Sequence, residues 1–106
     1  MLPKKGRVTK ELFQDVMKNG KILGSSFFVL RYIPQNPPKY AFVVPKTLVK
    51  QAIIRNKLRR VGYNIVRQIP KTPLVMGIFF YKKLAKTVSF EELKNDINSL
   101  LSKTKL

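Results

Sequence analysis

The sequence predicts an α+β fold, a single-domain α-β sandwich in which helices pack against a sheet. Apolar residues recur at helical spacing in three segments, and short runs rich in β-branched and aromatic residues lie between them. A hydrophobic content of 44% is near the globular average, so this chain of 106 residues is expected to fold despite its net charge of +17. With no repeat and no linker, residues 1–106 are expected to form one domain.

The first helix is expected to follow Thr9, a suitable N-cap, and to end at Asn19 and Gly20. Its apolar stripe consists of Leu12, Phe13, Val16 and Met17. Two strands are expected next, over 27–33 and 40–44, because both runs are β-branched and aromatic. The proline-rich segment 34–38 is expected to be the loop between them, which predicts that the two strands pair as a hairpin.

A long second helix is expected to begin at a Thr47 cap and to reach about Gln68. Its core stripe is predicted to contain Ile54, Leu58, Val61, Ile65 and Ile69. Gly62 in its interior costs about 1 kcal/mol relative to alanine, which disfavours a straight helix at that point. A buried strand is expected over 74–81, and Ser89 with Glu92 forms a capping box that opens the last helix.

Two residue types that carry much of protein chemistry are absent from the sequence. Without cysteine there are no disulfides, thiol nucleophiles or Cys-based zinc sites, and without histidine the commonest general base and metal ligand is missing. Only five carboxylates remain: Glu11, Asp15, Glu91, Glu92 and Asp96. Glu11 and Asp15 are one helical turn apart, as are Glu92 and Asp96, so each pair is spaced to reach one magnesium ion. A solvated helix surface is the favoured interpretation of both pairs. The polypeptide is therefore expected to have no catalytic residue and no metal site of its own.

No apolar run approaches the roughly 20 residues of a membrane span. The N-terminus has no apolar stretch after its first lysines, so no secretory signal is expected. We expect a cytoplasmic protein that does not associate with membranes.

The positive charge is concentrated in the middle of the chain. Between Asp15 and Glu91 there is no acidic residue, although 15 of the 22 Lys and Arg lie there. Such a single-sign stretch predicts a basic face that binds phosphates. A membrane surface is the rival polyanion, but the apolar side of the segment 50–67 is needed for the core, and the chain has no tryptophan. Nucleic acid is favoured.

The densest basic cluster spans residues 50–60. Arginine suits phosphate oxygens because its planar fork donates two parallel hydrogen bonds, and Asn56 adds a neutral donor and acceptor. No acid lies one turn away to offset the repulsion, which favours an anionic partner over a merely solvated surface.

This cluster resembles the signature of the protein subunit of bacterial ribonuclease P. The signature is a lysine, a spacer with alanine, and then Arg-Asn-basic-aliphatic-basic-Arg, which matches Lys50, Ala52 and the run 55–60. Supporting matches lie along most of the chain, at 2–5, 13–14, 18–21, 28–30, 42–44 and 89–93. The resemblance implies that residues 1–106 are a single RNA-binding domain.

The resemblance further implies a four-stranded sheet with three helices and a left-handed βαβ crossover. It also implies that a catalytic RNA removes the 5′ leader of precursor tRNA with RNA-held Mg²⁺, while the protein assists and has no obligate protein partner. The residues implied to bind the catalytic RNA are Lys46, Lys50, Arg55, Asn56, Lys57, Arg59, Arg60 and Arg67. The residues implied to line a cleft for the leader are Arg7, Phe13, Met17, Val29 and Arg31.

The chain departs from the family pattern at four places. Thr47 stands where a second lysine is common, and Tyr63 begins a stretch that is commonly Arg-Glu. Met17 and Arg31 occupy cleft positions that are often aromatic, so we expect the leader to be held more by charge than by stacking. A ribosomal protein or RNA chaperone that binds structured RNA without a reaction is the alternative function. A free-standing nuclease is disfavoured by the missing histidine.

Overall fold

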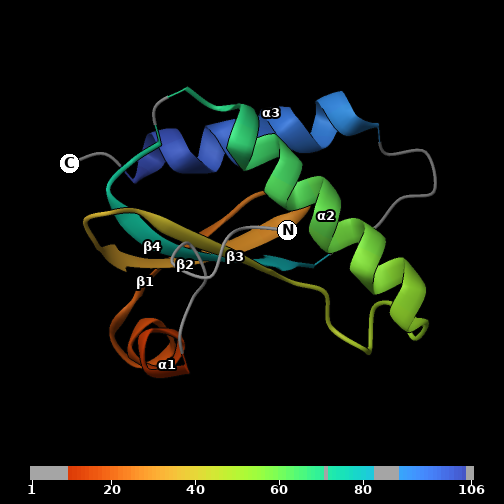
Figure 1. The fold of residues 1–106 in the computed structure, drawn as a ribbon, viewed down its shortest axis with the longest axis horizontal. Coiled ribbons are helices and arrows are strands. Elements are labelled where there is room, and N and C mark those ends of the chain that lie inside the picture. The colour runs from red at the N-terminus through yellow and green to blue at the C-terminus, as the bar shows by residue number, and fades with distance from the viewer. Residues whose placement is uncertain (1–9, 71, 83–88, 105–106) are drawn as a thin grey trace.

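The computed structural model describes residues 10–70, 72–82 and 89–104. A four-stranded sheet lies between two helical layers, with α1 on one side and α2 and α3 on the other (Figure 1). The elements are α1 (Lys10–Asn19), β1 (Lys21–Gly24), β2 (Phe28–Pro34), β3 (Lys39–Val43), α2 (Ala52–Gln68), β4 (Val75–Tyr81) and α3 (Phe90–Lys103). The predicted α+β sandwich is confirmed. None of the helices in the described ranges is long and apolar enough to cross a membrane.

The strand order is β1-β2-β4-β3, which contradicts the predicted hairpin between 27–33 and 40–44. β4 lies between β2 and β3, antiparallel to β2 and parallel to β3, and Phe79 is opposite both Leu30 and Phe42. The reason is the composition of β4: every residue except Phe80 is buried. A strand that is apolar on both faces is stabilised in the centre of a sheet, where both of its edges are paired and both faces are covered. β1 has no counterpart among the strands predicted from local pattern.

Alternating residues of β2 serve two separate cores. Phe28, Leu30 and Tyr32 are buried on the face covered by α2 and α3, and they belong to the larger core. The intervening residues Val29 and Arg31 are half-buried on the face of α1. Strand β2 is therefore covered more completely on the first face than on the second.

The larger core is rich in aromatic rings. Phe42 stacks on Phe79 with 4.8 Å between ring centroids, and Phe28 contacts Tyr81 at 4.6 Å. The Tyr81 hydroxyl donates to the Leu58 carbonyl at 2.8 Å, which ties β4 to α2. Burial raises the pKa of Tyr81 above its usual value, so this hydroxyl keeps its proton.

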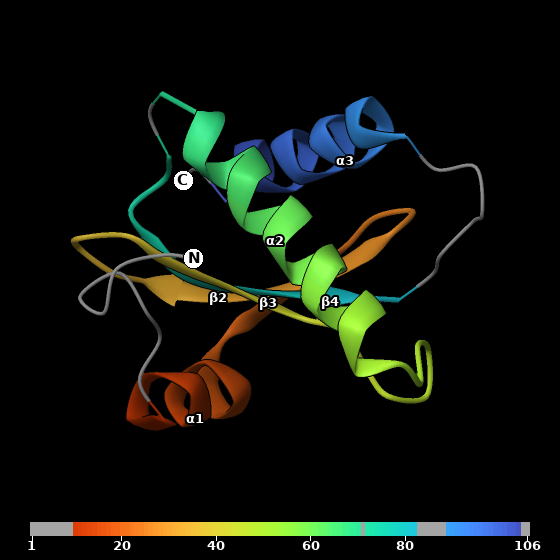
Figure 2. The ribbon, with the colours of Figure 1, turned by 45° about the vertical axis from the view of Figure 1, so that its right-hand side comes forward.

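Helix α2 begins later than predicted and reaches beyond the sheet (Figure 2). The predicted cap Thr47 lies in a turn closed by Pro45, whose carbonyl accepts from the amides of Leu48 and Val49. Ile54 is 41% exposed, so its predicted place in the core stripe is wrong. Because the first turns of α2 extend past the sheet, they have no apolar surface to pack against. Farther along, Ile65 is fully buried, as predicted.

The capping box at the start of α3 is confirmed. Ser89 Oγ accepts from the Glu92 amide at 3.2 Å, and the Glu92 carboxylate accepts from the Ser89 amide at 3.4 Å. One turn later, Asp96 Oδ2 accepts from Ser25 Oγ at 2.5 Å and from the Phe27 amide at 3.1 Å. Asp96 therefore joins α3 to the turn between β1 and β2.

Candidate nucleic-acid interface

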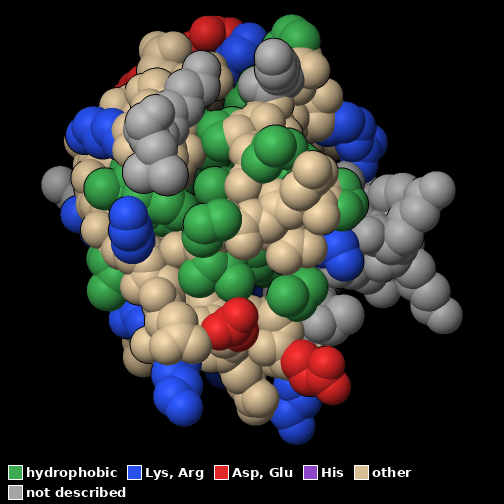
Figure 3. Space-filling model, turned by 90° about the vertical axis from the view of Figure 1, so that its left-hand side faces the viewer, with side chains coloured by type: hydrophobic (Ala, Val, Ile, Leu, Met, Phe, Trp, Pro, Cys, Tyr) green, Lys and Arg blue, Asp and Glu red, His purple; other side chains and the backbone are tan. Residues whose placement is uncertain are grey.

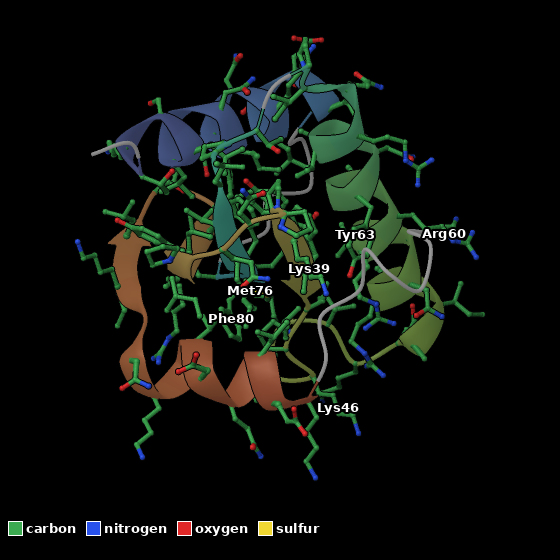
Figure 4. All side chains as sticks on the ribbon, turned by 60° about the vertical axis from the view of Figure 1, so that its left-hand side comes forward. Lys39, Lys46, Arg60, Tyr63, Met76 and Phe80 are labelled. Atoms are coloured by element: carbon green, nitrogen blue, oxygen red, sulfur yellow. The ribbon has the colours of Figure 1, made fainter. Side chains whose placement is uncertain are left out.

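The outer surface of α2 and of the loop before it presents the basic cluster to solvent. The predicted residues that are exposed there are Lys46, Lys50, Asn56, Lys57, Arg60 and Arg67, while Arg55 and Arg59 are half-buried. Figure 4 shows Arg60 directed outward from α2. The first turn of α2 contains no acidic residue and its last turn carries Arg67, so nothing on the helix neutralises this charge. We call these eight residues the basic face.

Arg55 has a structural contact as well as a place on the basic face. Its Nη1 donates to the carbonyl of Val49 at 3.0 Å and to that of Lys50 at 2.7 Å. These bonds hold the loop against the first turn of α2, where Gln51 provides no side-chain cap. Arg55 thus positions Lys50 and still presents part of its guanidinium.

Asn56 and Arg59 face one another on successive turns of α2. Arg59 Nη2 donates to Asn56 Oδ1. Because this bond occupies the amide oxygen, the Asn56 amide nitrogen is directed away from Arg59 and remains a donor. The pair therefore directs preorganised donors outward while the amide oxygen faces Arg59, which suits a phosphate.

The opposite side of the sheet carries a second, smaller core under α1. Only Val16, Met76 and Ile78 are fully buried in this core of the described chain. The surrounding hydrophobic residues are half-buried: Leu12, Phe13, Ile33, Ala41, Val43 and Phe80. Helix α1 is the single described helix on this face, and these side chains keep part of their surface exposed, so part of this apolar floor stays accessible. We call the half-buried surface beside α1 the α1 groove.

The structure brings four of the five predicted leader residues together at the α1 groove. Phe13 and Met17 come from α1, and Val29 and Arg31 come from the facing side of β2. Arg31 Nη1 donates to the Met17 carbonyl at 3.2 Å, which links helix and strand directly. Arg7 lies outside the described residues.

A family model described as Ribonuclease P matches residues 2–105. The chain belongs to the ribonuclease P protein family. The ribonuclease P protein component of a Nitratiruptor species is 29% identical over 98 residues, which are 92% of this chain and 89% of that protein. The resemblance carried by residues 50–60 is therefore confirmed, and the chain is a protein component of ribonuclease P, a partner of the ribonuclease P RNA and of its tRNA substrate.

Solved ribonuclease P proteins share the fold. The protein from Thermotoga maritima superposes with a TM-score of 0.81 at 22% identity, covering 94% of this chain and 98% of that one. A Staphylococcus aureus RNase P protein mutant with defective mRNA degradation activity gives a TM-score of 0.81 at 21% identity, covering 95% and 89%. These likenesses confirm the three-helix, four-stranded architecture; the handedness of the β3-α2-β4 crossover stays a prediction.

Three residues of this ribonuclease P protein on the α1 side of the sheet were not predicted from the sequence. Phe80 lies opposite Val29, and Met76 lies opposite Ile33 and beside Lys39. Figure 4 shows Lys39, Met76 and Phe80 together, with Lys46 toward α1. Because the run 74–81 is apolar throughout, its periodicity does not separate the two faces, and only the strand register assigns Phe80 to the groove.

Three carboxylates have hydrogen-bond partners within the protein. Asp15 Oδ1 accepts from Asn19 Nδ2 at 2.7 Å, Glu92 serves the capping box, and Asp96 accepts from the β1–β2 turn. Across 10–70, 72–82 and 89–104, no group of three or more Asp, Glu, His or Cys comes together to hold a metal ion.

Proposed function

We propose that the basic face binds the catalytic RNA of ribonuclease P and that the α1 groove binds the 5′ leader of precursor tRNA. The observation that carries the proposal is the acid-free helix α2, which exposes Asn56, Lys57, Arg60 and Arg67 on a chain of net charge +17. The positive charges of such a surface repel one another, and the phosphates of an RNA backbone offset this repulsion. Binding also releases the counterions that the RNA phosphates had condensed.

The α1 groove has the properties that a single-stranded leader requires. Phe13, Val29 and Phe80 are half-buried and supply an apolar floor on which bases can stack without sequence preference. Arg31 and Lys39 are also half-buried, and they place positive charge beside that floor. A strand of RNA can therefore rest its bases on the sheet and its phosphates against the two cations.

The chemistry of cleavage belongs to the RNA in this proposal. The metal that the family implies would supply the activated water, and the described residues include no cluster of three or more Asp, Glu, His or Cys to hold it. The protein contributes position and charge: Arg60 and Lys57 neutralise phosphates of the catalytic RNA, while Arg31 holds the leader in register. Both effects increase the fraction of precursor tRNA that is bound in a reactive geometry.

Reconstitution tests the proposal. We expect precursor tRNA cleavage at moderate magnesium to require both the chain and its cognate RNA, and Arg60→Ala to weaken binding of that RNA by about 1–3 kcal/mol. Lys94→Ala on α3 is the matched control, because it removes one positive charge away from the basic face. Binding is measured by filter retention and cleavage by release of the labelled leader.

Two outcomes would contradict the proposal. Cleavage by the chain alone would show that the polypeptide itself carries the catalytic groups. No stimulation with the cognate RNA, together with binding of unrelated structured RNA, would favour the RNA-chaperone alternative.

A further inference from the structure

A pocket of about 500 Å³ opens at one end of the sandwich, where β2 ends and β4 begins. Its walls are mostly apolar and include Ile33, Pro34 and Leu74. Figure 3 looks onto this end and shows hydrophobic side chains gathered in the middle, with Lys and Arg side chains around them. The volume falls in the range of small-molecule sites, roughly 300–1,000 Å³. The pocket is separate from the basic face and from the residues proposed to contact RNA in the α1 groove. The half-buried Ile33 lies on the boundary between the pocket and the α1 groove.

One nearly buried tyrosine of this pocket has a hydroxyl without a partner in the described ranges. Tyr32 is only 8% exposed and lines the pocket. The hydroxyls of Tyr40 and Tyr81 donate to backbone carbonyls, whereas the Tyr32 hydroxyl makes no hydrogen bond within the described parts of the chain. Within the described residues, every fully buried side-chain oxygen has a hydrogen-bond partner. The Tyr32 hydroxyl has none, so it is not fully buried. We assign its exposed surface to the pocket that Tyr32 lines.

The rim supplies a complementary charge. Lys21 is exposed, lies opposite Tyr32 in the β1–β2 pairing, and lines the same pocket. An apolar slot, one phenol hydroxyl and one ammonium group together match a ligand with a flat apolar ring, a polar ring edge and an anionic group. A hydrocarbon chain would leave the hydroxyl and the ammonium unused.

We propose that this pocket binds a nucleotide. The base lies against the apolar walls of the pocket, its edge exchanges a hydrogen bond with the Tyr32 hydroxyl, and its phosphate pairs with Lys21. The same chemistry is presented by a free mononucleotide and by an unstacked residue of an RNA. The second source rests on the proposed function of the chain, and the first does not.

Methyl NMR of the full chain tests binding with defined probes. Adenosine 5′-monophosphate and uridine 5′-monophosphate are titrated against ribose 5-phosphate, which has the phosphate without the base. We expect both nucleotides to shift the methyl signals of Ile33, Leu74 and Val75, and ribose 5-phosphate to leave them in place. Unshifted signals with millimolar nucleotide, or equal shifts with ribose 5-phosphate, would overturn the proposal.

Conservative variants separate the polar contacts from packing. Tyr32→Phe removes only the hydroxyl and is expected to weaken nucleotide binding roughly 3- to 10-fold, and Lys21→Gln to weaken it by a similar factor. The controls are Tyr63→Phe, which removes a hydroxyl on α2, and Lys10→Gln, which removes one charge at the start of α1. Equal affinity in all four variants, each with an unchanged amide spectrum, would contradict the assignment of these groups.

The source is distinguished by RNA binding with Tyr32→Phe. Weaker binding of catalytic RNA or precursor tRNA, alongside weaker mononucleotide binding, supports an RNA residue as the occupant. Unchanged RNA affinity with weakened mononucleotide binding supports a free nucleotide. In either case, stimulation of precursor tRNA cleavage by the unaltered chain is a separate test of the proposed function. The nucleotide pocket and the proposed function can therefore fail independently of one another.

Discussion

Single side chains of the candidate interface are held in place before any RNA arrives. Arg31 donates to the Met17 carbonyl, Arg55 to two loop carbonyls, and Arg59 to Asn56. Each contact restricts a long side chain that would otherwise lose rotamer freedom on binding, and so lowers the entropy that binding must overcome. The family resemblance implies RNA-binding roles for these arginines. Their contacts could not be predicted from the sequence, because the carbonyl that orients Arg31 comes from another element.

Substitution of Arg31 separates leader binding from binding of the tRNA body. Arg31→Ala is expected to weaken binding of leader-containing precursor tRNA about 5-fold or more, and to leave binding of leaderless tRNA unchanged, because the proposed function puts only the leader in the α1 groove. Arg31→Lys keeps the charge without the planar fork and should recover part of the loss. The measurement is a pair of titrations with the assembled ribonucleoprotein. An equal effect on both tRNAs would count against a leader contact.

Among the helices and strands, the contact between α2 and β3 gives Gly62 a structural role. The helix is continuous through this residue, and a Cβ atom added there would collide with the ring of Phe42 on β3. The glycine therefore allows α2 to approach the sheet closely. Helix propensity alone favours alanine at position 62. Glycine is nevertheless the better residue there, because the Phe42 ring, which is distant in the sequence, leaves no room for a Cβ atom.

Gly62→Ala is accordingly expected to destabilise the protein by about 1–3 kcal/mol, despite the better helix former, because the Phe42 ring must leave its stacking position. Urea unfolding followed by circular dichroism measures the free energy. Gly24→Ala is the matched control: the nearest atom to its added Cβ is Lys82 Nζ at 3.8 Å, an ordinary contact. A stabilised Gly62→Ala variant would show that α2 can move away from β3 without loss.

Over the molecule as a whole, the net charge of +17 is distributed unevenly. The two acidic residues of α1 lie at one end of the chain and those of α3 at the other, whereas α2 has none. RNA binding should therefore depend strongly on salt and be centred on α2.

We expect the logarithm of the RNA association constant to fall linearly with the logarithm of salt concentration, with a slope of roughly −0.7 to −0.9 for each neutralised phosphate. Arg60→Ala should reduce the magnitude of that slope by about one such contact, and Lys94→Ala on α3 should leave it unchanged. Filter binding between about 50 and 200 mM salt gives both slopes. Equal slopes in Arg60→Ala and the unaltered chain would remove Arg60 from the phosphate contacts.

The three helices, the basic face and the family were all predictable from the sequence, because periodicity, charge and the run 55–60 are local properties. The features that were not include the place of β4 between β2 and β3, the position of Phe80 in the α1 groove, and the pocket that Tyr32 shares with Lys21. They depend on strand order and register, which exist only once the chain is folded. Pairing between distant segments sets both, because burial of an apolar strand on both faces outweighs the proximity of its neighbours in sequence.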